Sequence, residues 1–267
     1  MSTRCLDKVN KLAQKRARVI SSYQEPYRER RAGLAFQLRR LEIMKLRICV
    51  LTVAIAAGLS AAHKAVERVD RAAEVLNEVM GTPDKAVPSE LLSKAHCVAI
   101  IPGVKKFGLG LGGKYGKGVI TCRGPGGNGW TGPSTVRIEG GSIGFQIGGS
   151  STDVVLLVMN KKGKDKLLSS KVTLGADAAV AAGPVGRSAQ AQTDVQMHAE
   201  ILSYSRSRGV FVGVSLEGAT LRPDNKDNKA IYGKEVTPRK ILDGKVAAPA
   251  STNALTAALM KYSAKEH

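Results

Sequence analysis

Closely spaced glycines between Phe107 and Gly149 limit what this chain can fold into more than any other feature. The 267-residue chain has 29 glycines, and many of them lie in this stretch. Gly108, Gly110 and Gly112 alternate, so one face of a strand there carries no side chains, which permits strong curvature or a closely packed helix. The spacing therefore predicts a β-rich region with tight turns.

Short apolar runs separated by glycine and proline clusters predict many short strands. Helical patterns precede and follow them, and the short connections favour antiparallel pairing. We therefore expect an α+β fold: a single domain of many short, mostly antiparallel, glycine-rich strands flanked by N- and C-terminal helices. The expected strands are His96–Ile101, Phe107–Leu111, Tyr115–Cys122, Thr135–Ile138, Ser142–Ile147, Asp153–Met159, Ala178–Ala182, Ile201–Ser205 and Val210–Leu216, and the expected later helices are Pro88–Lys94, Lys164–Ser170, Pro238–Leu242 and Thr252–Tyr262.

The first helix of this domain is predicted from apolar residues at helical spacing between Val66 and Met80. It ends at Gly81 and Pro83. The stripe beside the apolar residues is acidic rather than basic, which favours packing against the core over contact with an anionic membrane.

Residues 44–62 have the order of a secretory signal: Met44, two basic residues, an apolar run and then small residues. The run is shorter than the ~20 residues of a comfortable transmembrane helix. Basic residues 1–43 have two explanations: an upstream start codon assigned in error, which we favour, or a basic tail on an uncleaved anchor. We expect an exported protein, periplasmic or associated with the cell envelope, cleaved near Ala62–His63, with its domain in residues 63–267.

The formal net charge is +19, and nearly half of the excess precedes His63. Residues 63–267 carry 28 basic and 18 acidic side chains, so the domain itself is moderately basic. Such a charge favours anionic partners, either lipid headgroups or nucleic acid. Nucleic acid is the weaker candidate, because aromatic residues for base stacking do not interleave with the lysines.

Cys97 and Cys122 are the cysteines of the predicted domain. They could pair in an oxidising compartment, but the sequence favours two buried free thiols. No CxxC pair or Cys/His cluster has metal-ligand spacing. We therefore expect neither a metal site nor a cofactor.

Glycine motifs that match nucleotide-binding and hydrolase signatures lack the context that those signatures need. Gly108–Lys114 nearly matches a P-loop, but a predicted strand follows it instead of a helix. Gly140–Gly144 matches the GxSxG pattern around Ser142, yet both flanks are extended and the plausible histidine, His198, is distant. Asp224–Asn228 has oxygen ligands but is typical of a plain loop. The sequence predicts a protein without enzymatic activity.

The strongest basic run of the domain supplies the candidate lipid-binding side chains, together with two lysines that flank the glycine-rich strand. Two interpretations stay open, a solvated surface and a headgroup-binding patch. Under the second, replacing the four lysines of the run by serine weakens liposome binding about tenfold or more, since ~1.4 kcal/mol gives tenfold. The candidates are Lys161, Lys162, Lys164, Lys166, Lys105 and Lys106.

Ordered motifs extend over about 190 residues between Val66 and Leu259. Together they resemble the SYLF domain family, also described as the Las17-binding or actin-regulator family. One departure is Gly132, where the family usually carries alanine. The motifs are Val98–Pro102, Phe107–Val119, Gly129–Ser134, Gly144–Gly149, Thr152–Asp153, Leu156–Asn160, Leu174–Asp177, Ala182–Arg187, Ser203–Ser205, Gly209–Gly218, Asn228 and Tyr232–Gly233.

This resemblance implies a single-domain, non-enzymatic module that binds membrane lipids, phosphoinositides in eukaryotic members, some of which also bind actin. With a signal-like segment and no SH3 or FYVE module, the chain resembles the stand-alone bacterial type, which argues against actin as a partner. The family's lipid binding is associated with the start of the domain. The alternative is a secreted structural or protein-interaction domain without a lipid ligand.

Overall fold

The computed structural model describes residues 62–81, 87–109, 111–143, 148–185, 198–207, 210–214 and 216–263. The chain divides into two compact units, and every described residue lies in the second, Leu59–His267. The predictions for residues 1–43 and for the signal-like segment up to residue 61 lie outside the described residues. No helix in the described part is long and apolar enough to span a bilayer.

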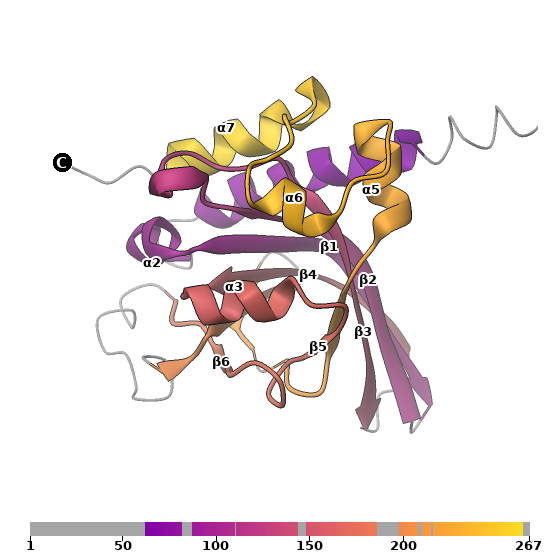
Figure 1. Ribbon diagram of the computed structural model, residues 1–267. Coiled ribbons are helices and arrows are strands. Elements are labelled where there is room, and N and C mark those ends of the chain that lie inside the picture. Colours follow the sequence, from indigo (N-terminus) through magenta and orange to yellow (C-terminus); the bar gives the residue numbers. More distant parts are fainter. Residues whose placement is uncertain are drawn as a thin grey trace, which may run out of the picture. The chain divides into compact units, whose positions relative to one another are not determined.

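A nine-stranded sheet organises the described unit (Figure 1). Its strand order is β5-β9-β3-β2-β1-β4-β7-β6, with β8 pairing with β7. The pairings are antiparallel except that of β6 with β7. The α+β prediction is confirmed. The strands are β1 (Cys97–Leu109), β2 (Leu111–Cys122), β3 (Ser134–Ile143), β4 (Gly148–Val158), β5 (Val172–Thr173), β6 (Val180–Ala182), β7 (Ile201–Ser207), β8 (Val210–Gly213) and β9 (Thr220–Pro223).

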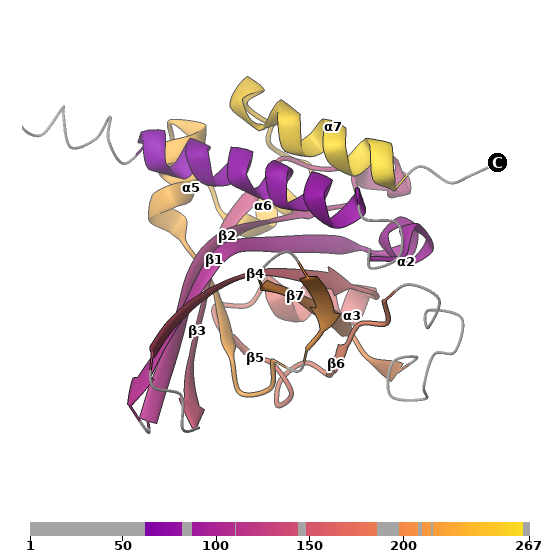
Figure 2. The ribbon, with the colours of Figure 1, turned by 180° about the vertical axis from the view of Figure 1, so that it is seen from behind.

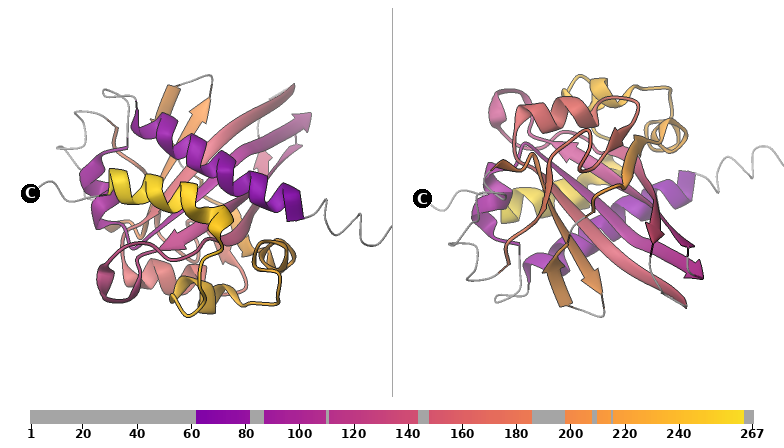
Figure 3. Two further views of the ribbon diagram at one scale, coloured as in Figure 1. Left: turned by 90° about the horizontal axis from the view of Figure 1, so that it is seen from above. Right: turned by 90° about the horizontal axis from the view of Figure 1, so that it is seen from below.

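Helices cover both faces of this sheet. The helix of residues 62–80 and α7 (Asn253–Tyr262) lie side by side over one face, as Figures 2 and 3 show. On the other face, α3 (Lys161–Leu167) and α6 (Pro238–Leu242) contribute apolar side chains to a second core. The short α2 (Ser89–Lys94) precedes β1, and α5 (Asn225–Tyr232) follows β9.

Strand β1 separates two hydrophobic cores. Val98 and Ile100 face the core that contains the helix of residues 62–80 and α7. Cys97, Ala99 and Ile101 face the core that contains α3 and α6. Because successive strand residues point to opposite faces, a strand covered on both sides needs a nearly continuous apolar run, and this run supplies it.

The first helix packs against the core, as its acidic stripe predicted. Val69, Leu76 and Val79 are each at most 1% exposed. Its apolar face is therefore already covered by the sheet, and only its polar side remains for a partner.

One continuous strand, β1, replaces the two strands predicted on either side of Lys105. The register of β1 with β2 shifts between Ile100 and Lys105, which marks a bulge. A Cβ atom at Gly118 would lie 2.2 Å from the carbonyl oxygen of Ile100, and one at Gly116 would lie 2.8 Å from Val104. The glycines of β2 thus make room for the bulge. The prediction that Gly108 and Gly112 lie on one strand is wrong, because they are partners across the β1–β2 hairpin.

One helix begins earlier than predicted, and another replaces a predicted loop. α3 begins three residues before the predicted Lys164, because the side chain of Asn160 caps it and accepts a 2.8 Å hydrogen bond from the backbone N–H of Gly163. The loop predicted at Asp224–Asn228 is wrong: Asp224 directly precedes α5, and Asn228 is fully buried within that helix. Side-chain contacts with distant Thr135, rather than helix propensity, hold Asn228 there.

The preference for free thiols is also wrong. Cys97 and Cys122 are direct partners in the β1–β2 register, and they form a disulfide. Both residues are fully buried. The strand register, which residue composition cannot reveal, brings the two sulfur atoms together.

Candidate functional site

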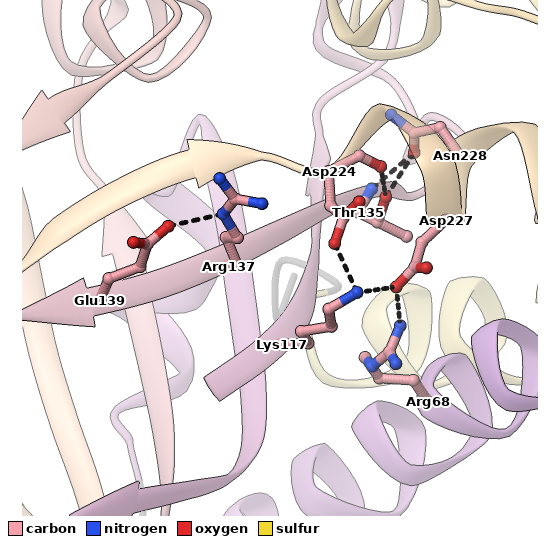
Figure 4. A network of polar contacts seen from close by, with 8 residues as sticks. All are labelled: Arg68, Lys117, Thr135, Arg137, Glu139, Asp224, Asp227 and Asn228. Carbon is pink, nitrogen blue, oxygen red and sulfur yellow. Dashed lines mark hydrogen bonds and ion pairs between the residues drawn. The ribbon is translucent and has the colours of Figure 1, made fainter. Parts of the chain in front are cut away.

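A polar network joins the first helix, the sheet and α5 (Figure 4). The Nζ atom of Lys117 lies 2.6 Å from Oδ2 of Asp224 and 3.1 Å from Oδ2 of Asp227. Arg68 lies 2.5 Å from the same Asp227 oxygen. Two cations and two carboxylates neutralise one another here, so this network positions elements rather than offering free charge to a ligand.

The titration of this network follows from its geometry. Burial alone would lower the pKa of Lys117, but the hydrogen bonds to Asp224 and Asp227 and their negative charges raise it above its ordinary value. Burial alone would raise the pKa of Asp224, but the hydrogen bond and charge of Lys117 hold it below its ordinary value. Both shifts favour the charged pair, which identifies it as a stabilising contact.

Asn228 completes the network on its buried side. Its Oδ1 atom accepts hydrogen bonds from the backbone N–H of Thr135, at 2.7 Å, and from the Thr135 hydroxyl, at 2.9 Å. Its amide nitrogen donates to the hydroxyl of Ser134 at 3.1 Å. These contacts fix α5 against β3 and keep Lys117 of the neighbouring strand beside its carboxylates.

The free end of the β1–β2 hairpin carries lysines without carboxylate partners. Lys106 and Lys114 are direct partners in the register. Burial lowers the pKa of Lys114, and the positive charge of Lys106 lowers it further. No carboxylate of the described residues lies within ion-pair distance of either lysine or of the adjacent Lys105. Like charges directly opposite in a sheet destabilise it, so fold stability does not explain this pair.

Exposed aromatic side chains accompany these lysines. Phe107 is 60% exposed and Tyr115 is 42% exposed. Gly113 is the register partner of Phe107, and a Cβ atom there would lie 2.9 Å from the Phe107 ring, so the ring covers a glycine rather than entering a core. Lys105 is the partner of Tyr115. We call Lys105, Lys106, Phe107, Lys114 and Tyr115 the free-end cluster.

The predicted lysine run does not form one free cationic patch. Lys162 and Lys166 both pair with Glu200, at 3.2 and 2.7 Å. Burial alone would raise the pKa of Glu200, but the two lysines outweigh it and hold the pKa below its ordinary value. Lys164 lies 3.3 Å from Asp243. Lys161 has no carboxylate partner among the described residues.

The six predicted lysines therefore fall into two separate places. Lys105 and Lys106 lie in the free-end cluster at the far end of β1, whereas Lys161–Lys166 lie in α3 near the start of β1. Sequence reasoning missed the exposure of Phe107 and Tyr115. The glycines near Phe107 are a signal that could have predicted this exposure. An aromatic ring can lie over the bare backbone of a glycine such as Gly113, so it can stay on the surface instead of packing in a core.

The motifs that resemble catalytic signatures lie on strands. The segment that nearly matches a P-loop lies in the β1–β2 hairpin: Gly108 is near the end of β1 and Gly112 is near the start of β2. A strand follows it instead of the helix that a P-loop requires. Ser142 lies in β3, paired with Gly112, where the nucleophile-elbow pattern requires a strand-to-helix turn. Gly110 and residues 144–147 lie outside the described residues. Within the described part of the chain, no three His, Cys, Asp or Glu side chains are grouped to hold a metal ion.

Known proteins carry the same domain. Residues 139–262 match the family model Ysc84, described as "Las17-binding protein actin regulator". SH3 domain-containing YSC84-like protein 1 of Xenopus laevis is 31% identical over 202 residues, which cover 73% of this chain and 60% of that protein. LAS seventeen-binding protein 3 of Saccharomyces cerevisiae is 34% identical over 183 residues, which cover 67% of this chain and 39% of that protein.

The shared region is thus a part of longer proteins, since the chain spans between 39% and 60% of the length of these relatives. The match begins within β3 and runs into α7, so it includes Asp224, Asp227 and Asn228 of the polar network but not their partners Arg68, Lys117 and Thr135. The chain belongs to the Ysc84 family of SYLF-domain proteins.

Proposed function

We propose that residues 63–267 form a non-enzymatic module that binds anionic membrane surfaces through the free-end cluster. The observation that carries this proposal is the Lys106–Lys114 pair, two cations held directly opposite each other without a carboxylate partner among the described residues. An anionic surface would relieve the repulsion between them, as carboxylates do for Lys162 and Lys166 elsewhere in the protein.

The chemistry of the cluster matches a membrane interface. Each lysine near an anionic leaflet contributes about 1 kcal/mol, and aromatic rings settle at the level of the headgroups. The alternation of strand residues places Phe107 and Tyr115 on one face of the hairpin and Lys106 and Lys114 on the other. An end-on approach of the hairpin brings both kinds of side chain to the surface.

Export to the cell envelope is the second part of the proposal. It rests on the signal-like order of residues 44–62 and on the Cys97–Cys122 disulfide, a bond that forms and persists in oxidising compartments. N-terminal sequencing of protein from its native host tests this part. A start near His63 supports export with cleavage, and an intact residue 1–43 segment on the mature protein contradicts cleavage and the assignment of Met44 as the true start.

A second candidate function is a protein-interaction domain. The description of the family and the name of the yeast relative support it, because both give Las17 as a binding partner. A protein-interaction domain would not sediment with anionic vesicles. Its binding to a protein partner also need not weaken as salt rises, whereas the binding of the free-end cluster to an anionic membrane should.

Co-sedimentation with phosphatidylglycerol vesicles, beside neutral phosphatidylcholine vesicles, tests the membrane proposal. Residues 63–267 are suited to it, because both cores are built within Ala65–Leu259. The test variant is Lys105→Ser/Lys106→Ser/Lys114→Ser. The matched control, Lys171→Ser/Lys226→Ser/Lys234→Ser, removes the same charge from exposed positions elsewhere.

We expect the test variant to bind phosphatidylglycerol vesicles at least tenfold more weakly, since three lysines contribute about 3 kcal/mol and ~1.4 kcal/mol already gives tenfold. The control should bind within about twofold of the wild type. Binding should also weaken as salt rises, because the Debye length falls to ~3 Å at 1 M. Equal binding by all three proteins contradicts the proposed surface, and no binding to any vesicle contradicts the membrane function.

A further inference from the structure

A polar cleft lies at the opposite end of the β1–β2 ladder from the free-end cluster. Its volume is about 1110 Å³. The end of α2, the glycine-rich turn after β2, α3 and α6 contribute its walls. β1 begins at Cys97 and β2 ends at Cys122, so the disulfide joins the two strand ends next to His96 and Arg123, which line the cleft.

The described lining of this cleft does not favour an acyl chain as its ligand. Among the described residues no large apolar side chain lines it, and four lining residues are glycines. The described lining has five lysine and arginine side chains against two carboxylates, a net charge of +3. A site of this composition suits a small, hydrophilic anion.

Three of the five cations have no carboxylate partner among the described residues. Lys94 pairs with Glu90 outside the cleft, and Lys164 pairs with Asp243 inside it. The remaining three are Arg123, Lys161 and Arg239. They approach the cleft from the end of β2, from α3 and from α6.

Arg123 is fixed in place before any ligand arrives. Its guanidinium lies 4.2 Å from the centroid of the Trp130 ring. One guanidinium nitrogen donates to the backbone carbonyl of Ser93 at 2.9 Å. The Trp130 indole is itself held by a 3.0 Å hydrogen bond to Ser263. A guanidinium positioned in this way loses little freedom when it binds an oxyanion.

Fold stability does not account for Lys161. It stands in the first turn of α3, where the helix dipole disfavours a cation, and that turn contains no acidic residue.

The glycine-rich turn that also lines the cleft is open: Gly126, Gly127 and Gly129 have positive φ, and added Cβ atoms there would meet nothing within 4 Å. Glycine is thus needed for the backbone conformation, and the absence of side chains keeps the cleft open.

We propose that this cleft binds a phosphate ester that also carries hydroxyl groups. Arg123, Lys161 and Arg239 hold the phosphate, because guanidinium and ammonium groups form charge-assisted hydrogen bonds with its oxygens. Asp165, which has no ion-pair partner among the described residues, accepts hydrogen bonds from the hydroxyls. This site is separate from the free-end cluster and does not depend on the proposed membrane contact.

Calorimetric titration of the full chain with glycerol 3-phosphate tests the cleft, with glycerol and inorganic phosphate as companion probes. The test variant is Lys161→Ser/Arg239→Ser, which leaves the structural contacts of Arg123 intact. The control Lys226→Ser/Lys234→Ser removes the same charge from exposed positions outside the cleft. Circular dichroism establishes that all proteins are equally folded.

We expect the test variant to bind glycerol 3-phosphate at least tenfold more weakly than the wild type, and the control to bind within twofold. Glycerol should not bind, and inorganic phosphate should bind more weakly than the ester. Equal affinities for the three proteins overturn the proposal, as does a wild type that binds none of the phosphate probes.

Phosphatidylglycerol vesicles identify the source of the phosphate ester. If the test variant also loses vesicle binding while the control keeps it, the ligand is a lipid headgroup; if vesicle binding is unchanged, the ligand is a soluble ester. Lys105→Ser/Lys106→Ser/Lys114→Ser should keep its affinity for glycerol 3-phosphate. Failure of the membrane proposal and failure of the cleft are therefore separate results.

Discussion

The two ends of the β1–β2 ladder are both rich in lysine and arginine, but they differ in what surrounds those side chains. Near the disulfide, carboxylates from distant segments neutralise several lysines: Glu200 holds Lys162 and Lys166. At the hairpin end, Lys106 and Lys114 face each other alone among the described residues. The comparison teaches that the position of carboxylates, rather than the number of lysines, decides where a basic protein can bind an anion.

Removing the disulfide should have the largest effect on stability, and it should act on the cleft end. Cys97→Ala/Cys122→Ala opens a link between residues 25 apart in sequence, and such links contribute about 3 kcal/mol. We expect the free energy of unfolding in urea to fall by about this amount. Vesicle binding by the remaining folded protein should be unchanged, because the free end lies at the other end of the strands. Loss of vesicle binding with an intact fold would show that the two ends are coupled.

Breaking the polar network between the two ends should cost somewhat less. Asp224→Asn leaves Lys117 with one carboxylate instead of two, and we expect a loss of about 2 kcal/mol at pH 7. Lys114→Ser at the free end is the matched comparison. It also changes one charge next to the backbone of β2 but breaks no ion pair, so it should not show this loss of stability.

The same variant has a defined pH dependence. The pKa of Asp224 lies below its ordinary value of ~3.9, so its contribution is present above about pH 4 and disappears as the pH falls through the lowered pKa. The pKa of Lys117 lies above ~10.4, so its contribution is present below about pH 10 and disappears as the pH rises through the raised pKa. Thermal unfolding across pH should show the largest difference between wild type and variant between these limits. A difference that stays constant down to pH 2 contradicts this assignment.

Freeing the neutralised lysines should make the cleft end more like the free end. Glu200→Gln removes the carboxylate that Lys162 and Lys166 share. The freed lysines would give the cleft end a second contact with phosphatidylglycerol vesicles, separate from the free end, and one added net positive charge there contributes about 1 kcal/mol, or roughly fivefold tighter binding. The control is Glu217→Gln, an exposed glutamate that has no lysine partner among the described residues. If both variants bind alike, total charge rather than release of these lysines explains the gain.

Relieving the repulsion at the free end should have the smallest effect on the free energy of unfolding. It should stabilise the fold while weakening vesicle binding. Lys114→Thr removes one of two facing cations and introduces a residue that favours strands, so we expect stability to rise by about 0.5 kcal/mol. Vesicle binding should weaken at the same time. A variant that loses stability instead would show that Lys114 contributes packing that outweighs the repulsion.

Much of the fold follows from patterns local to the sequence. The glycine and proline clusters mark the turns, and the apolar run of β1 marks a strand covered on both faces. The acidic stripe of the first helix correctly predicts that its apolar side packs against the core. β5 and β9 were missed because strands of two and four residues have no periodicity to detect.

Contacts between distant residues could not be predicted in this way. The disulfide depends on the pairing of Cys97 with Cys122, and the helix at α5 depends on the hydrogen bonds of Asn228 to Thr135. The departure at Gly132 has a similar cause: a Cβ atom there would lie 2.5 Å from the hydroxyl of Tyr232, 100 positions later in the chain.

The sequence by itself determined the α+β class, the resemblance to the SYLF family and the basic character of the domain. Those properties depend on composition and on spacing over a few residues. Only the tertiary structure decided which lysines are available to an anion, because a lysine's charge is offset by whichever carboxylate folding brings within a few ångströms. Glu200 is 34 residues from Lys166, whereas Lys106 and Lys114 meet no carboxylate of the described residues at all.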